Sequence, residues 1–147
     1  MFQANQESAI RISNAAAAAT TDVTSDEVNT ANYEGCKFYT FFGTITTGAV
    51  TSVKIQQSDD DGVADAYSDL EGTSITVADD DDNQVVIHDI FRPTKPYLRV
   101  IVDRGTQNAV VDGVFAVRYG ARDLPTTDDS ATVVARECHA SPAEGTA

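Results

Sequence analysis

The sequence predicts an all-β protein, an antiparallel β-sandwich or jelly roll with extended N- and C-terminal arms. Three observations lead to this prediction. Short segments alternate between apolar and polar residues, β-branched and aromatic residues gather in them, and turns rich in Asp and Gly separate them at near-regular spacing. Seven or eight short strands arranged in this way are typical of sandwiches and jelly rolls.

The clearest strands lie between residues 36 and 120, which we take as the sandwich core. Residues 36–45 are rich in aromatic and β-branched residues, as in a central strand. In residues 51–58, Val53, Ile55 and Gln57 alternate with polar neighbours, and an Asp-Asp-Asp-Gly turn follows. Further strands are expected at residues 64–70, 74–77, 84–91, 97–103 and 109–119.

Two of these later strands have well-defined faces, although two prolines in residues 92–96 exclude that stretch from a sheet. In residues 97–103, Leu98, Val100 and Val102 share one face. In residues 109–119, the residues that share a face are Gly113, Phe115, Val117 and Tyr119.

The two ends of the chain are less strongly patterned. Residues 1–35 are expected to form an N-terminal arm with the first short strand, at residues 9–13, and a small-residue strand or linker at 15–19; residues 22–32 look turn-like. Residues 121–147 cannot supply a core of their own. They are either a frayed, disordered tail or an arm that orders on a neighbouring subunit. We expect residues 1 to about 13 and residues 121–147 to be dispensable for folding.

Composition restricts the possible functions. The 147 residues suit a single domain, and the formal net charge of −13 would repel nucleic acid and anionic lipid alike. Besides giving solubility, such a surface suits a basic partner or salty surroundings. Neither a signal peptide nor an apolar run long enough to span a membrane is visible. We therefore expect no nucleic-acid partner, no membrane, and a chain that is made and kept in a cytosol or assembled there into something larger.

Candidate reactive residues are few. Cys36 starts an apolar strand and is expected in the core, while Cys138 and His139 are adjacent in a polar segment, where neighbouring side chains diverge. His88 alternates with Val86 and Ile90 and is expected to be partly buried.

The acidic turns invite a calcium site. An EF-hand loop with Gly62 at its sixth position would place Ser68 where a bidentate Glu is required, so a solvated turn is the better interpretation. The sequence also contains no nucleophile-elbow, zinc-protease or phosphate-loop motif. We expect no catalytic residues, no metal and no cofactor.

Three segments in fixed order carry a resemblance to a known family. They are Val50 to Gly62 (V-T-S-V-K-I-Q-Q-S-D-D-D-G), Tyr67 to Thr73 (Y-S-D-L-E-G-T) and Pro96 to Val100 (P-Y-L-R-V). This order resembles that of capsid cement, or head decoration, proteins of tailed phages. The resemblance covers about residues 36–120, and Tyr67 stands where that family often has Trp.

The resemblance implies a non-enzymatic virion protein that binds the major capsid protein on the outer surface of the head, as a homotrimer. Two alternatives remain: a phage tail or baseplate structural protein, and a carbohydrate-binding β-sandwich module. We expect self-association through strand edges or exposed apolar positions such as Tyr39, Phe41 and Ile101. The candidate partner-binding residues combine two of these with apolar anchors in the arms: Phe2, Ile10, Ile12, Tyr39, Phe41, Val133 and Val134.

Overall fold

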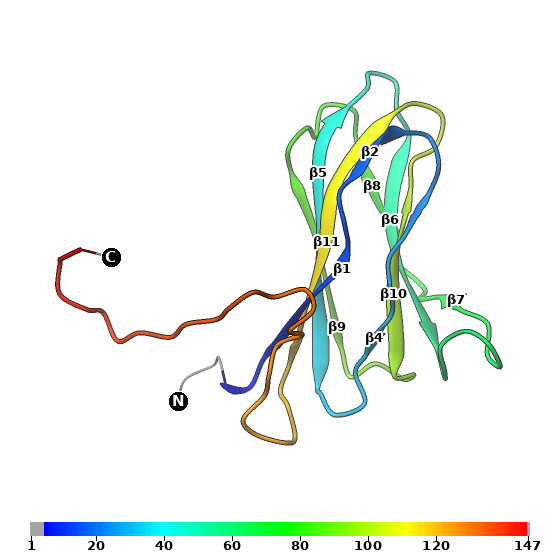
Figure 1. Cartoon of the computed structure of the whole chain (residues 1–147). Helices are drawn as coiled ribbons and strands as arrows, with labels where there is room; N and C mark the ends of the chain where they lie inside the picture. Colours follow the sequence, from blue (N-terminus) through cyan, green and yellow to red (C-terminus); the bar gives the residue numbers. More distant parts are fainter. Residues whose placement is uncertain (1–4, 147) are drawn as a thin grey trace.

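The computed structural model describes residues 5–146, in which two antiparallel sheets pack face to face as a sandwich (Figure 1). Sheet A has the order β1-β11-β5-β9, with β2 also paired to β11. Sheet B has the order β3-β10-β6-β7, with β4 paired to β10 and β8 to β6. Sheet A consists of β1 (Ser8–Ser13), β2 (Ala16–Ala19), β5 (Gly35–Ile45), β9 (Val85–Phe91) and β11 (Ala109–Tyr119). Sheet B consists of β3 (Val23–Thr24), β4 (Val28–Asn29), β6 (Thr51–Ser58), β7 (Ser68–Asp69), β8 (Ile75–Val77) and β10 (Tyr97–Asp103).

The strand order is that of a jelly roll. The short strands share positions in pairs, because β1 and β2 both flank β11, β3 and β4 both flank β10, and β7 and β8 both flank β6. Numbering the shared positions along the chain gives 1-8-3-6 in sheet A and 2-7-4-5 in sheet B. Two interlocked Greek keys produce this arrangement. The predicted fold class is therefore confirmed by the topology itself.

The core lies between the sheets and contains aliphatic residues and phenylalanine. Phe38, Leu98, Val100 and Val102 are fully buried, which confirms the predicted inward face of β10. In β11 the inward residues are Val114 and Ala116, so the face that alternation grouped as Gly113, Phe115, Val117 and Tyr119 points outward. Ile101 is also buried, so its predicted role as an exposed contact residue is wrong.

Two stretches differ from the sequence prediction. The segment 22–32 was expected to be turn-like, yet it supplies β3 and β4, each two residues long and paired with β10. So short a pairing has no alternation for a sequence pattern to reveal. The strand expected over residues 64–70 is limited to Ser68–Asp69, because the preceding residues form a loop held by aspartate side chains.

The N-terminal segment is part of the sandwich rather than a free arm. Strand β1 pairs with β11 from Ser8 to Ser13, and Ile12 is only 1% exposed within the core, against which Ile10 also packs. These two side chains therefore pack in the sandwich rather than on a flexible arm, and we now expect the loss of residues 8–13 to destabilise the fold. Phe2 lies outside the described residues.

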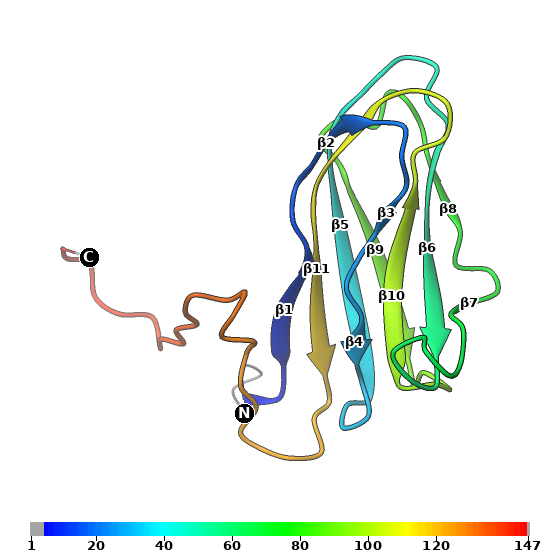
Figure 2. The same ribbon diagram turned by 45° about the vertical axis from the view of Figure 1, so that its right-hand side comes forward.

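The C-terminal segment turns back along the open edge of β1 before it leaves the body of the protein (Figure 2). The backbone N–H groups of Thr126 and Asp129 donate to the carbonyls of Asn5 and Ala9, and Ala9 N–H donates to Asp128. Within the C-terminal segment, Arg136 forms a bidentate ion pair with Asp128 and so holds this carboxylate in place. Beyond it the chain projects away from the sandwich (Figure 1).

Candidate binding surface

The outer face of sheet A carries a band of apolar side chains that no other described element covers. Antiparallel pairing places directly opposed residues on the same face. One row across the sheet therefore contains Phe115, Tyr39 and Ile87, and the next contains Phe41 and Val85. Phe41 is 44% exposed and Ile87 53%. Tyr39 and Phe41, predicted from sequence as partner-binding residues, thus lie side by side at the centre of this outer face.

Two shallow hollows flank Phe41 on this face. Gly113 stands opposite Phe41 in β11, at a bulge with φ +146°, where it contributes no side chain. On that side a hollow of about 240 Å³ lies between Phe41, Phe115 and Arg11. On the other side, a hollow of about 470 Å³ is bounded by Phe41 and Val85. Phe41 therefore forms a ridge between the two hollows, and a complementary surface could contact both sides of its ring.

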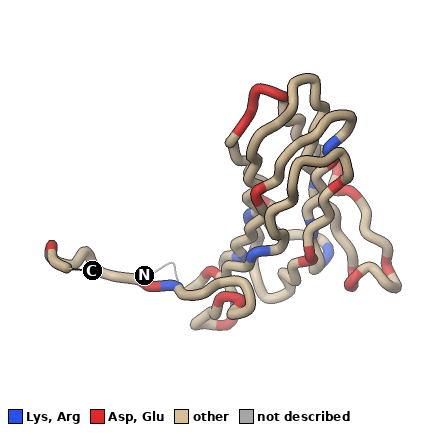
Figure 3. The backbone as a smooth tube through the Cα atoms, turned by 45° about the horizontal axis from the view of Figure 1, so that its top comes forward, with Lys and Arg blue, Asp and Glu red and all other residues tan. Residues whose placement is uncertain are grey.

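The charges on this face differ from those elsewhere. Arg11 and Lys37 lie in its rows, beside Asp89, and Figure 3 shows that acidic residues gather mainly in the loops. Tyr119 donates its hydroxyl proton to Asp89 at 2.6 Å, and Lys37 lies 5.5 Å from the Tyr119 ring centroid. Burial, followed by this hydrogen bond, raises the pKa of Tyr119. In a chain of net charge −13, a nearly neutral apolar face is the region where a second macromolecule meets least repulsion.

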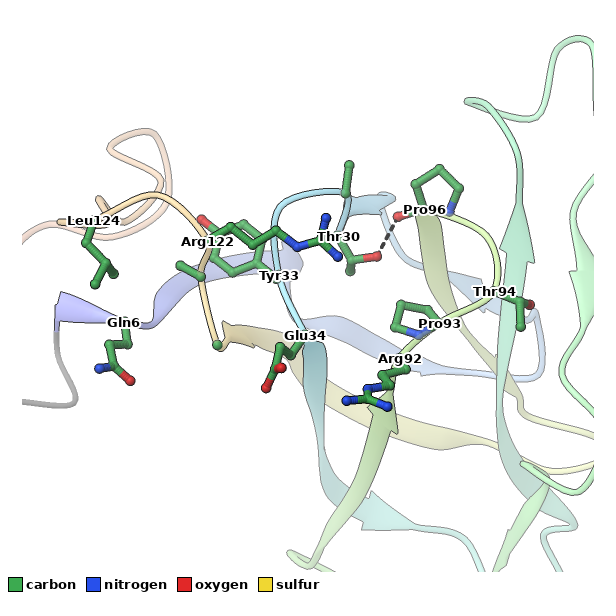
Figure 4. Close-up of a pocket in the computed structure, with 13 residues that line it drawn as sticks. Gln6, Thr30, Tyr33, Glu34, Arg92, Pro93, Thr94, Pro96, Arg122 and Leu124 are labelled. Atoms are coloured by element: carbon green, nitrogen blue, oxygen red, sulfur yellow. Dashed lines mark hydrogen bonds between the residues drawn. The ribbon is translucent and has the colours of Figure 1, made fainter.

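A polar cavity of about 770 Å³ opens at one end of the sandwich, where the β4–β5, β9–β10 and β11 exit loops meet (Figure 4). Thr30 fixes its wall by donating both its N–H and its hydroxyl proton to the Pro96 carbonyl. Arg92, Arg122 and Glu34 line it, and among the described residues none of these three side chains forms an ion pair. The cavity suits a small polar or anionic group.

The acidic turn after β6 is closed by its own side chains. Asp60 accepts N–H bonds from Gly62, Ala64 and Asp65 at 2.8–3.2 Å. Partial burial acts to raise the pKa of Asp60, but the bonds from Ala64 and Gly62 outweigh it and lower the pKa overall. Within residues 5–146, no group of three potential ligands is arranged to hold a metal ion.

A lysine neutralises part of the same turn. Lys95 bonds to Asp65 at 2.6 Å and reaches Asp59 at 3.2 Å. The bond from Lys95 is the largest cause of the lowered pKa of Asp65, and the Asp59 N–H adds to it. The carboxylates that could face a cation are therefore already committed to donors within the chain.

The cysteines and histidines are separated from one another. Cys36 is fully buried, which raises the pKa of its thiol to about 12. His88 is buried as predicted, and its Nε2 lies 2.7 Å from the Thr73 carbonyl. Cys138 is exposed and free, and its neighbour His139 contacts Glu137 instead. The described residues contain no helix long and apolar enough to cross a membrane.

The remaining predicted contact residues lie on the C-terminal segment. Val133 is half-buried and Val134 is fully exposed. Both follow Thr132, which bonds to Arg11 of β1, so β1 and β11 lie between this segment and Tyr39 and Phe41 of β5. Sequence reasoning missed Val85, Ile87 and Phe115 as members of the outer face. Their alternation in β9 and β11 was visible, but which of the two faces pointed outward was not.

Comparisons with known proteins give no family. No protein-family model matches the sequence, and no curated protein matches it significantly. A chain of the disulfide-linked pili that form Bacillus endospore appendages is 17% identical, with a TM-score of 0.42 over 82% of this chain and 96% of that chain. A chain in the structure of infectious bursal disease virus, strain Gx, is 14% identical, with a TM-score of 0.40 over 84% of this chain and 32% of that chain. Because both scores are below 0.5, the fold assignment rests on the strand order described above.

Proposed function

We propose that this chain is a non-enzymatic structural protein of the capsid cement type, which binds the major capsid protein on the outside of a tailed-phage head. The observation that carries the proposal is the uncovered apolar outer face of sheet A, with Phe41 at its centre. A face of this kind on a soluble domain marks an interaction site. The family resemblance of residues 36–120 supplies the identity of the partner.

The physical basis is the addition of buried surface at capsomer junctions. A rigid jelly roll that lays one sheet face across adjoining subunits resists their separation without any chemistry. Repetition over many equivalent sites lets contacts of modest affinity act together. The homotrimer implied by the resemblance would place three such faces around one junction, and it remains a prediction.

Co-sedimentation with undecorated heads tests the proposal. We expect Phe41→Glu to weaken attachment by at least about tenfold, because losing one buried Phe side chain removes about 1.5–3 kcal/mol. Val63→Glu is the matched control, since Val63 is exposed in the acidic loop, away from the outer face. Equal binding of the Phe41→Glu variant and the parent protein would contradict the use of this face. Electron microscopy of the particles would separate head from tail or baseplate attachment.

A further inference from the structure

The two edges of sheet A differ in whether another segment of the chain pairs with them. The β1 edge is covered by the protein's own C-terminal segment, through the bonds of Thr126, Asp128 and Asp129 to residues 5–9. At the opposite edge, β9 pairs with β5 on one side, and no described strand pairs with its other side. The seven residues of β9 therefore present a row of backbone donors and acceptors that is open to another strand.

The open strand lacks the usual protection of sheet edges. Its sequence, Val-Val-Ile-His-Asp-Ile-Phe, contains neither Lys nor Pro, the residues that commonly block edge pairing. Ile87 is 53% and Phe91 57% exposed. The one acidic residue, Asp89, is held by Tyr119 on the outer face. The inward face of the strand is also fixed, because the Nε2 atom of His88 contacts the Thr73 carbonyl there.

The flanks of β9 carry opposite charges. Four consecutive aspartates, residues 79–82, precede the strand, and Arg92 follows it directly. Arg92 forms no ion pair among the described residues; its guanidinium lies over the Phe91 ring, 5.0 Å from the centroid. Asp80 is exposed. In an antiparallel pair of identical strands, the start of each strand lies beside the end of the other. The acidic flank of one copy would then meet the arginine of its partner at both ends.

We propose that β9 pairs antiparallel with β9 of a second copy of this chain, so that the two A sheets join into one continuous sheet. The contact is isologous, with the same residues contributed by both copies. Because the contact uses the β9 edge of both copies, and because the C-terminal segment of each copy bonds along residues 5–11 at the opposite edge, addition through sheet A stops at two copies. This inference concerns the free chain in solution and does not depend on capsid attachment; a homotrimer formed on the head is a separate prediction.

The test is the dimer dissociation constant of the full chain in the absence of any capsid, measured by sedimentation velocity over a concentration series. Ile87→Lys places a charge on the open edge strand, and we expect it to weaken dimerisation at least about tenfold. Val63→Lys is its matched control and should leave the constant unchanged, since Val63 is exposed in a distant loop. A monomer at all concentrations, an assembly of three copies, or equal effects of the two lysines would overturn the proposal.

A second variant pair tests the flanking charges. Arg92→Glu should weaken the dimer more at low than at high salt, because exposed charges are screened over about 10 Å at 0.1 M ionic strength. Arg122→Glu is the control, because Arg122 lines the same end cavity as Arg92 but does not flank β9. Both arginines are exposed and neither makes an ion pair with another described residue, and the two substitutions alter the net charge identically. Equal responses of the two variants, or slowed amide exchange outside residues 85–91 instead of within them on dimerisation, would contradict the pairing.

Discussion

Arg104 provides the most demanding test of how this sandwich is held together, because its charge is buried. The side chain is 5% exposed, and its guanidinium donates to three backbone carbonyls, those of Ala17, Thr21 and Ala109. These carbonyls belong to β2, to the loop after it and to the start of β11. One side chain thus fixes the N-terminal strands to the last strand at the end of the sandwich.

The effect of Arg104→Ala follows from opposing terms. Each hydrogen bond to a charged group contributes about 1.5–3 kcal/mol net, and three are lost. Water can replace part of this at Ala17 and Thr21, which are exposed, but not at Ala109, which is buried. In the opposite direction, removing the buried charge also removes its desolvation penalty of several kcal/mol, which favours the folded state. We expect a net loss of about 3 kcal/mol in the free energy of unfolding, or a fall of about 6–12 °C in melting temperature for a chain of this size.

Urea denaturation followed by circular dichroism measures this loss. Arg104→Lys should fall between the parent and Arg104→Ala, because a single ammonium cannot reach three divergent carbonyls as the planar guanidinium does. Arg122→Ala is the control and should change stability by less than about 0.5 kcal/mol, as exposed surface substitutions usually do. A loss below about 1 kcal/mol for Arg104→Ala would refute the assignment of Arg104 as the link between β2 and β11.

Three further predictions concern the C-terminal segment, His88 and metal. Truncation after Gly120 should lower the melting temperature, because it exposes Ser8 and Ala9, which are now buried, whereas truncation after Arg136 should leave it unchanged; equal melting temperatures of the two truncations would contradict the attachment to β1. Burial lowers the pKa of His88, so the unfolded state binds more protons than the folded state as the pH falls through about 6.5. The free energy of unfolding should therefore decrease below that pH. Chemical denaturation between pH 7 and pH 5 measures this decrease, which a His88→Gln variant should lack. EDTA should not change the melting temperature, since Asp60 and Asp65 are already bonded to donors within the chain. A metal ion at a free concentration 100 times its dissociation constant would add about 2.7 kcal/mol to the free energy of unfolding, so its removal by EDTA would visibly lower the melting temperature.

The long strands were predictable because their pattern is strong. Residues 51–58, 97–103 and 109–119 were expected as strands, and β6, β10 and β11 have those bounds. Alternation over seven or more residues leaves little choice of period. It does not say which face is inward, which is why Phe115 was grouped correctly on one face of β11 without being recognised as outward.

The chain ends could not be predicted because polar groups decide their structure. Residues 126–132 attach to residues 7–11 through the Thr126 and Thr132 hydroxyls and the Asp128 carboxylate, and these polar side chains form no hydrophobic pattern. Composition alone correctly indicated that the segment has no core of its own. It could not reveal that the edge of β1, in the same chain, supplies the missing partners.

The acidic composition and the apolar face are two parts of one arrangement. With a net charge of −13, copies of this chain repel each other in most orientations, and the repulsion is strongest where the aspartate loops approach. Orientations that bring residues 79–82 of one copy to Arg92 of another escape that penalty and also align the open edges of β9. The net negative charge therefore disfavours most relative orientations of two copies and favours the orientation in which their charges are complementary. Salt screens both the repulsion between copies and the attraction between residues 79–82 and Arg92. High ionic strength should therefore increase non-specific association of the Arg92→Glu variant. We expect the parent chain to stay dimeric, because the proposed backbone pairing of β9 does not depend on charge.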